Sequence, residues 1–103
     1  DIYSLFGNAL DNAIESVICE PEESKRIISM RIGPRNEFLC IHIENYVRRE
    51  VKLSGGLPVT SKADKSYHGF GVLSIKRIVE KYHGSMSIRS DGNLFRLDIL
   101  IPL

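Results

Sequence analysis

Four polar side chains near the start of the chain have types and a spacing that suit a site for a metal ion and phosphate. They are Asn8, Asp11, Asn12 and Glu15. In a helix these positions fall on one side. Asparagine is a mediocre former of helix interiors, because its amide competes for backbone hydrogen bonds. Its oxygen is a neutral hard ligand, suited to Mg²⁺, which takes one or two protein oxygens beside water and nucleotide phosphates. The pattern predicts either a magnesium site or a solvated helix face.

A second signal is the run HGFG, from His68 to Gly71. Glycine lets a backbone approach a ligand closely, and the N-terminus of a helix favours phosphate. A flexible hinge or a plain turn needs the same residues. The run follows residues 46–68, which lack periodicity and are rich in glycine and lysine. A loop of that length is usually a functional lid or disordered, so the run favours a phosphate contact at the junction of a lid and a helix.

The elements that must position these residues follow from hydrophobic periodicity. Residues 4–16 predict a helix whose apolar side is expected to face the core, opposite the polar side chains. That side comprises Ile2, Phe6, Ala9, Leu10, Ala13, Ile14 and Val17. The stretch 69–84 predicts a second amphipathic helix that ends at Gly84. Its core positions are Val72, Ile75, Ile78, Val79 and Tyr82.

Residues 25–33, 38–45, 85–89 and 94–101 alternate as half-buried strands do. The predicted order is helix, hairpin, long loop, helix, hairpin. Two hairpins without crossovers favour an α+β fold, a two-layer α/β sandwich with a mostly antiparallel sheet. The expected core positions of the strands are Ile28, Met30, Ile32, Leu39, Ile41, Ile43, Met86, Ile88, Phe95, Leu97, Ile99 and Ile101. His42, on the other side of its strand, is expected to be a cross-strand partner.

The composition is that of one soluble globular domain. The chain has 103 residues, 43% of them hydrophobic and 26% charged, with a net charge of +1. It gives no case for a nucleic-acid or membrane surface. Cys19 and Cys40 lack metal-ligand spacing, which favours two reduced thiols in a cytoplasmic protein. The chain begins inside a helix without Met and is expected to be a piece of a longer protein.

Two long motifs, in order, resemble those of the ATP-binding catalytic domain of sensor histidine kinases, a Bergerat-type fold of the GHKL family. GNALDNAIES resembles the asparagine box, and GFGVLSIKRIVEKYHGSMSI resembles the second glycine region. The resemblance covers nearly the whole chain and implies ATP and Mg²⁺ as cofactors. It places Mg²⁺ on Asn12 and the phosphates near Asn8. The remaining implied nucleotide contacts are Asn45, Lys62 of the TSK run, His68, Gly69, Phe70 and Gly71.

The chain departs from most sensor kinases after its second strand. It has IENYVRRE where they have Asp-x-Gly-x-Gly, so Asn45 stands at the Asp position and both glycines are absent. That variant resembles the peptide-sensing, quorum-type receptor kinases. An asparagine amide can pair with the adenine edge through two hydrogen bonds. Alternatively, Asn45 caps the turn that follows the strand.

The resemblance also bears on catalysis. ATP hydrolases of this fold carry a glutamate general base one turn before the magnesium asparagine, where this chain has Asn8. An amide cannot accept that proton, so efficient hydrolysis is not expected. Sensor kinases transfer the γ-phosphoryl group to a histidine on a separate helical domain. Glu15, predicted to act with Asn12 in catalysis, could orient that partner or Mg²⁺-bound water, or could be a plain exposed glutamate.

The implied partners are a phosphoacceptor and dimerisation domain and a downstream response regulator, in a membrane-anchored, dimeric parent whose cytoplasmic part contains this domain. The N-terminal strand that usually precedes the first helix is absent. Two other hypotheses stay open at this stage. One is a degenerate nucleotide domain that serves as a protein-interaction scaffold, and the other is an anti-sigma-type serine kinase on the same fold.

Overall fold

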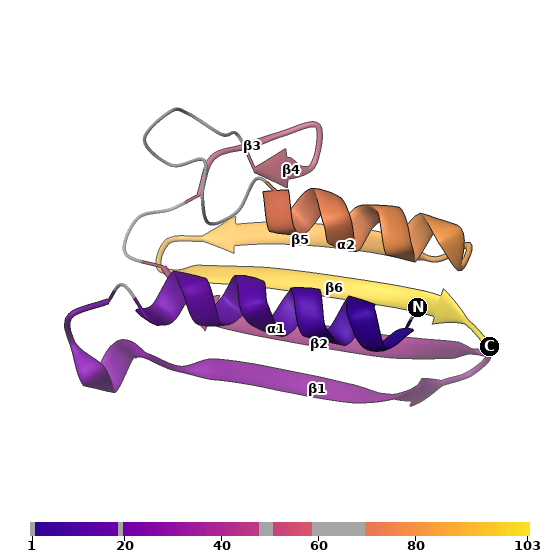
Figure 1. The fold of residues 1–103 in the computed structure, drawn as a ribbon, viewed down its shortest axis with the longest axis horizontal. Helices are drawn as coiled ribbons and strands as arrows, with labels where there is room; N and C mark the ends of the chain where they lie inside the picture. The colour runs from indigo at the N-terminus through magenta and orange to yellow at the C-terminus, as the bar shows by residue number, and fades with distance from the viewer. Residues whose placement is uncertain (1, 19, 48–50, 59–69) are drawn as a thin grey trace.

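The computed structural model describes residues 2–18, 20–47, 51–58 and 70–103. Two helices lie on one side of a four-stranded sheet (Figure 1). The elements are α1 (Ile2–Ile18), η1 (Glu23–Lys25), β1 (Ile28–Arg35), β2 (Phe38–Tyr46), β3 (Leu53–Ser54), β4 (Leu57–Pro58), α2 (Phe70–Lys81), β5 (Ser85–Asp91) and β6 (Leu94–Pro102). The predicted two-layer α+β architecture is confirmed. No described helix is long and apolar enough to cross a membrane.

The sheet joins the two predicted hairpins through their second strands. Its order is β1-β2-β6-β5, and each neighbouring pair is antiparallel. In the central pair, the register runs from Phe38 opposite Pro102 to Tyr46 opposite Leu94. Alternate residues of a strand point to opposite faces, so one face of this sheet lies under the helices and the other is open.

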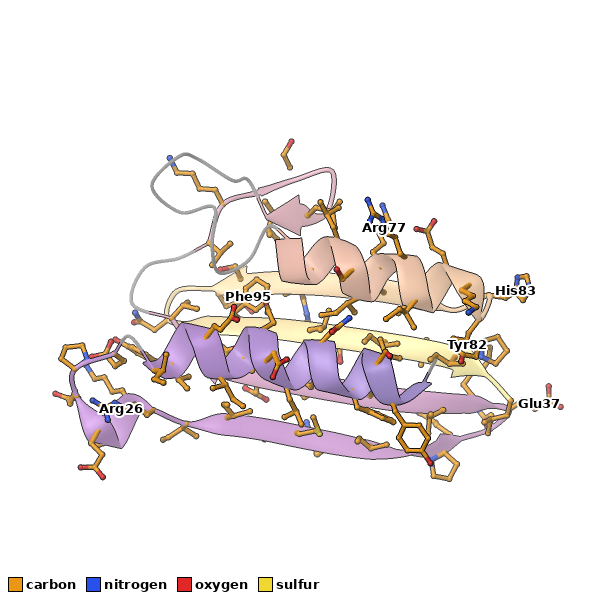
Figure 2. The ribbon with its side chains drawn as sticks, viewed as in Figure 1. Arg26, Glu37, Arg77, Tyr82, His83 and Phe95 are labelled. Atoms are coloured by element: carbon orange, nitrogen blue, oxygen red, sulfur yellow. The ribbon has the colours of Figure 1, made fainter. Side chains whose placement is uncertain are left out.

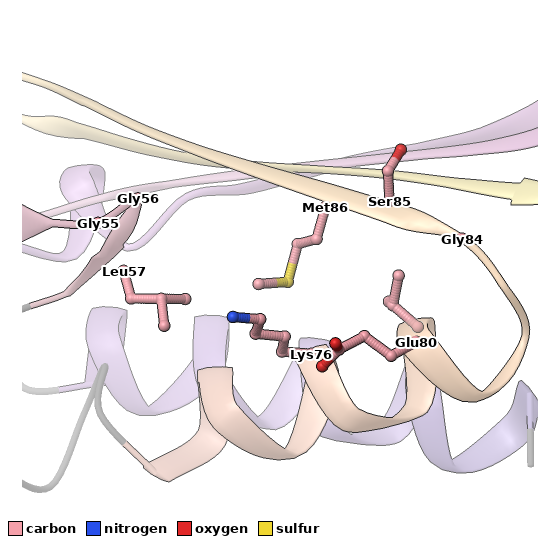
Figure 3. Close-up of a pocket in the computed structure, with 9 residues that line it drawn as sticks. Gly55, Gly56, Leu57, Lys76, Glu80, Gly84, Ser85 and Met86 are labelled. Atoms are coloured by element: carbon pink, nitrogen blue, oxygen red, sulfur yellow. The ribbon is translucent and has the colours of Figure 1, made fainter.

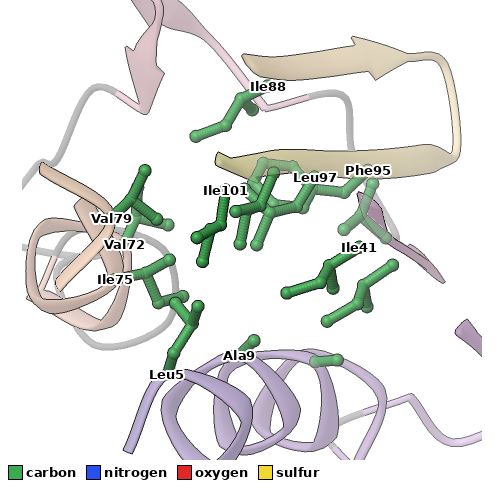
Figure 4. Packing of buried hydrophobic residues seen from close by; sticks show 14 residues of the cluster. Leu5, Ala9, Ile41, Val72, Ile75, Val79, Ile88, Phe95, Leu97 and Ile101 are labelled. Atoms are coloured by element: carbon green, nitrogen blue, oxygen red, sulfur yellow. The ribbon is translucent and has the colours of Figure 1, made fainter. Parts of the chain in front are cut away.

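The hydrophobic core fills the space between the helices and the sheet (Figure 4). Its most deeply buried large side chains are Phe95, Leu5, Ile41, Ile75, Ile99, Val72 and Val79. The sequence predicted the buried sides of β2, β6 and α2 correctly, because a strand of alternating residues or a helix with a narrow apolar stripe has one possible inner side. Met86 is half-buried against the same core.

The buried side of α1 differs from the prediction. Leu10 and Ile14, expected in the core, are 36% and 45% exposed, whereas Leu5 is fully buried. The stripe that packs inward instead contains Leu5, Ala9 and Ala13, which are spaced by four residues. The two alanines let the helix backbone approach its neighbours closely, and this brings the helix against α2 and β2. Hydrophobic periodicity alone centres the predicted apolar side of the helix on the longer aliphatic residues Leu10 and Ile14.

The predicted long loop contains regular structure in its first part. β3 and β4 form a small hairpin around Gly55 and Gly56, whose φ angles are 62° and 79°. Two consecutive positive φ angles are the signature of a type I′ turn, which glycine adopts without steric cost. Residues 48–50 and 59–68 of the predicted lid lie outside the described residues.

The C-terminus of α2 ends in a Schellman arrangement. Gly84 N–H donates to the Val79 carbonyl at 2.9 Å, and His83 N–H donates to the Glu80 carbonyl at 3.0 Å. The left-handed residue is His83, with φ 59°, and its side chain projects from the end of the helix (Figure 2). A Cβ atom on Gly84 would overlap the carbonyl oxygen of Leu100. Gly84 follows the end of the helix as predicted, but the left-handed residue is His83, and Gly84 instead allows close packing on β6.

Candidate functional site

The predicted polar side of α1 is divided in the structure. Asn12 is only 4% exposed, Asn8 is half-buried, and Asp11 and Glu15 are exposed. The expectation that all four lie opposite the core is therefore wrong. Because the buried stripe runs through Ala9 and Ala13, Asn12 lies at its flank and Asn8 lies one turn earlier on that flank. Asn12 is thus part of the interior, whereas Asp11 and Glu15 lie on the solvated side of the helix.

Asn45 is the second buried amide. It is 2% exposed and pairs with Phe95 of β6 and Ile28 of β1 across the sheet. Its side chain shares the inner face of β2 with Ile41 and Ile43, under the helix layer. Nδ2 donates to the Tyr46 carbonyl at 3.1 Å, a local bond of the kind that the capping alternative expects. The amide has a further N–H and a carbonyl oxygen, so this bond orients Asn45 without using all its capacity.

The chain that leaves β2 is fixed to the far end of the sheet. Val47 N–H donates to the Asn93 carbonyl at 2.7 Å, and Asn93 Nδ2 donates back to the Val47 carbonyl at 3.0 Å. Val51 N–H donates to Ser90 Oγ at 2.8 Å. These bonds place Val47 and Val51 beside the turn between β5 and β6. Sequence reasoning did not single out Asn93.

The described part of the glycine motif lies at the start of α2, as predicted. Phe70 and Gly71 form the first residues of that helix. The first N–H groups of a helix have no partner within the helix and carry the positive end of its dipole. Lys62, His68 and Gly69, the other predicted phosphate contacts, lie outside the described residues.

The chemistry of the donor set decides which metal could fit. Among the described residues, no group of three or more histidine, cysteine, aspartate or glutamate side chains could hold a metal ion. A metal enclosed by the protein alone does not fit this part of the chain. A magnesium ion that takes one amide oxygen, with water and phosphates as its other ligands, does fit the neighbourhood of Asn12.

Comparison with known proteins agrees with this arrangement. The family model described as GHKL domain matches residues 1–102. The chain belongs to the GHKL family. The domain is also 27% identical over 97 residues to a protein of Halalkalibacterium halodurans named "Probable C4-dicarboxylate sensor kinase". That match covers 91% of this chain and 18% of the relative, so the chain spans about one fifth of the relative's length. GHKL domains bind ATP.

The open face of the GHKL sheet carries a separate charged cluster. His42 contacts Asp98 directly across the β2–β6 pair, with Nδ1 2.5 Å from Oδ1, and its Nε2 lies 2.9 Å from Glu44 Oε1. The hydrogen bond to Asp98, and then that to Glu44, raises the pKa of His42. The hydrogen bond to His42 chiefly lowers the pKa of Glu44. His42 is thus the predicted cross-strand partner, on the face opposite Asn45. Cys40, on the same open face, is a free thiol, and Cys19 lies outside the described residues.

Proposed function

We propose that this GHKL domain binds ATP with Mg²⁺ and donates the γ-phosphoryl group to a histidine on a separate helical domain. The observation that carries the proposal is the burial of two amides, Asn12 on α1 and Asn45 on β2, in the layers that face each other. Both are polar groups inside an otherwise apolar core, and small-molecule sites combine an apolar lining with a few polar groups of this kind. Membership of the GHKL family and the similarity to a sensor kinase support the same function.

Each amide has a role in this proposal. Asn45 accepts a hydrogen bond from the N6 amino group of adenine and donates one to a ring nitrogen. Its bond to Tyr46 holds the amide in one orientation for that pairing. Asn12 offers its oxygen to Mg²⁺, and a bound Mg²⁺ would neutralise charge on the phosphates. The N–H groups at the start of α2 donate hydrogen bonds to phosphate oxygens, and Lys62, His68 and Gly69 of the preceding segment make further phosphate contacts.

The residues near the proposed magnesium site favour transfer of the phosphoryl group over hydrolysis of ATP. A hydrolase needs a base that takes a proton from water, and the amide of Asn8 cannot serve. His42 is held between two carboxylates on the open face of the sheet, and His83 lies in the turn after α2. Neither lies in a helical acceptor motif, so the acceptor histidine belongs to another domain. Glu15, exposed near Asn12, would orient that domain or Mg²⁺-bound water.

The parent that we propose is a dimeric, membrane-anchored receptor kinase with this domain in the cytoplasm and a response regulator downstream. The similarity to a sensor kinase supports this class of parent. The variant IENYVRRE after Ile41 and His42 supports the quorum-type subfamily. No feature of the described surface suggests nucleic acid as a partner.

Nucleotide titration tests the proposal. Loss of the Asn45 amide in Asn45→Ala should cost about 1 to 3 kcal/mol of binding, or about tenfold to a hundredfold in ATP affinity. Asn45→Asp should be milder, because the carboxylate keeps an acceptor for N6. The wild type should prefer ATP to GTP, whose edge reverses the donor and acceptor pattern.

Asn12→Ala should weaken binding of ATP with Mg²⁺ much more than binding of ADP without Mg²⁺. Asp11→Ala is the matched control, because Asp11 is the neighbouring residue on α1 and is exposed. If the Asn45 variants and the wild type bind ATP and GTP alike, Asn45 is only a strand cap. The scaffold hypothesis would then replace the kinase. Phosphorylation of serine instead of histidine on an added partner domain would favour the anti-sigma-type alternative.

A further inference from the structure

Three hydrogen bonds at the end of β2 connect Asn93 with the side chain of Asn45. Val47 N–H donates to the main-chain carbonyl of Asn93 at 2.7 Å. Asn93 Nδ2 donates to the Val47 carbonyl at 3.0 Å. Asn45 Nδ2 donates to the Tyr46 carbonyl at 3.1 Å. The first and the last of these bonds involve the same peptide unit, the one that joins Tyr46 to Val47.

This peptide unit couples the directions of the two bonds. A peptide unit is planar, and in the trans form its N–H and C=O point in opposite directions. Because Val47 N–H points to Asn93, the Tyr46 carbonyl points away from β6, toward the side of β1. There β1 begins at Ile28, opposite Asn45, so the ladder between β1 and β2 ends before Tyr46. The Asn45 side chain bonds to this carbonyl beyond the end of the ladder.

The Tyr46 carbonyl decides which end of the Asn45 amide lies beside it. A carbonyl oxygen only accepts hydrogen bonds, so it attracts Nδ2 and repels Oδ1. Oδ1 therefore lies on the other side of the planar amide. Asn45 is 2% exposed and lies opposite Phe95 on the inner face of the sheet, so little water is at hand to stabilise the reversed orientation.

We propose that Asn93 is a positioning residue for base recognition, which fixes the orientation of the Asn45 amide through the Tyr46–Val47 peptide unit. This role rests on the proposed function, in which Oδ1 of Asn45 accepts a hydrogen bond from N6 of adenine. A reversed amide would present N–H groups to N6, which is itself a donor, and would match the O6 acceptor of guanine instead. Asn93 thus contributes to a preference for ATP over GTP.

The side chain of Asn93 adds to the effect of its main chain. Its Nδ2 holds the carbonyl of Val47 while its own carbonyl holds the N–H of the same residue. The Tyr46–Val47 peptide unit therefore cannot rotate without straining the next one. Asn93 is exposed, so removal of its side chain opens no cavity in the core. A substitution there tests the hydrogen bond more than the packing.

The described chain beyond Val47 lies apart from these three bonds and supplies a matched control. Val51 N–H donates to Ser90 Oγ at 2.8 Å. The β3–β4 hairpin that follows closes one end of a cavity of about 260 Å³ beside α2 and β5, and neither Asn45 nor Asn93 lines it (Figure 3). Ser90→Ala therefore removes an anchor of the same region without touching the Tyr46–Val47 peptide unit.

NMR of the nucleotide-free chain tests the coupling itself. The side-chain N–H resonances of Asn45, assigned by their loss in Asn45→Ala, report the bond to the Tyr46 carbonyl. Asn93→Ala should shift these resonances and speed their exchange with water about threefold to tenfold, the factor that corresponds to one ordinary hydrogen bond. Ser90→Ala should leave them unchanged. Unchanged Asn45 resonances in Asn93→Ala would overturn the proposal, whatever the nucleotide affinities.

Nucleotide titration tests the consequence for the base. Asn93→Asp keeps the size of the side chain, but an ionised carboxylate cannot donate a hydrogen bond. In this variant and in Asn93→Ala, the ratio of ATP affinity to GTP affinity should fall about threefold to tenfold. In Ser90→Ala the ratio should be that of the wild type. An equal loss of affinity for both nucleotides in the Asn93 variants would indicate lower stability alone and would contradict a role in base recognition.

A double-mutant cycle shows whether Asn93 acts through Asn45. Asn93→Ala should lower the ATP-to-GTP ratio in the wild type and leave it unchanged in the Asn45→Ala background. An equal fall in both backgrounds would overturn the proposal. Equal binding of ATP and GTP by the wild type would refute the proposed function of Asn45, and the role in base recognition with it. The NMR measurement, made without nucleotide, distinguishes that failure from a failure of the coupling.

Discussion

The turn after α2 offers a test with two substitutions of opposite expected effect. His83 adopts a left-handed conformation with φ 59°, whereas Gly84 is held against β6. His83→Gly removes a side chain from a conformation that favours glycine. Gly84→Ala adds a methyl group where the backbone of Leu100 leaves no room. The two substitutions should therefore change the free energy of unfolding in opposite directions, although the residues are adjacent in one turn.

The magnitudes follow from the local geometry. A residue with a Cβ atom costs about 1 to 2 kcal/mol in the left-handed region, and the greater freedom of glycine in the unfolded chain offsets part of that. His83→Gly should raise the free energy of unfolding by about 0.5 to 1 kcal/mol. In Gly84→Ala, the new Cβ would also lie 3.2 Å from Val79 Cγ1 and 3.3 Å from Ile101 Cγ1. Overpacking of this kind costs about 1 to 3 kcal/mol.

Thermal and urea unfolding followed by circular dichroism measure both effects. Each kcal/mol corresponds to about 4 to 8 °C in Tm for a domain of this size. Gly92→Ala serves as a control, because Gly92 has a positive φ but open space around its Cβ position. It separates the cost of backbone conformation from the cost of overlap. A lower Tm for His83→Gly, or an unchanged Tm for Gly84→Ala, would refute this account of the turn.

Three further substitutions test contacts in the sheet. The pKa of His42 is raised by its two carboxylate partners, so its stabilisation is complete below its unfolded pKa of 6.5 and is lost as pH rises through the folded value. The difference in unfolding free energy between wild type and His42→Gln should therefore shrink with rising pH, and a constant difference would contradict this. Asn93→Ala removes the bond to the Val47 carbonyl and should cost about 1 kcal/mol in urea unfolding. Ser90→Ala should speed amide exchange at Val51 with little change in global stability, and an unchanged exchange rate would argue against the Ser90 contact.

The sequence predicted the fold because its signals were local. β2 and β6 alternate cleanly, and α2 has a narrow apolar stripe, so their inner sides could be assigned without tertiary information. The inner side of α1 could not, because the helix carries apolar residues over a wide arc. Which part of that arc is buried depends on its neighbours. Asn12 was predicted to lie on the outer side but is buried, because Ala9 and Ala13, beside it on the helix, form the contact stripe.

The remaining differences are contacts between residues far apart in the chain. The two hydrogen bonds between Val47 and Asn93 join positions that no sequence pattern connects. The β3–β4 hairpin has strands of two residues, too short for periodicity, although Gly55 and Gly56 signal a turn. Of the predicted site, the structure places Asn8, Asn12, Glu15, Asn45 and the start of α2. The roles assigned to these residues remain predictions.

The strand order also governs how the chain can fold during synthesis. The central strands β2 and β6 meet only after the segment between them has been made, as the 56-residue separation of His42 and Asp98 shows. A ribosome therefore releases α1 and the β1–β2 hairpin while the inner edge of β2 still lacks its partner. Such non-local pairing is slow, and an unpaired strand edge is prone to associate with other chains. The open edge of β2 is thus exposed to misassembly until the last strand is complete.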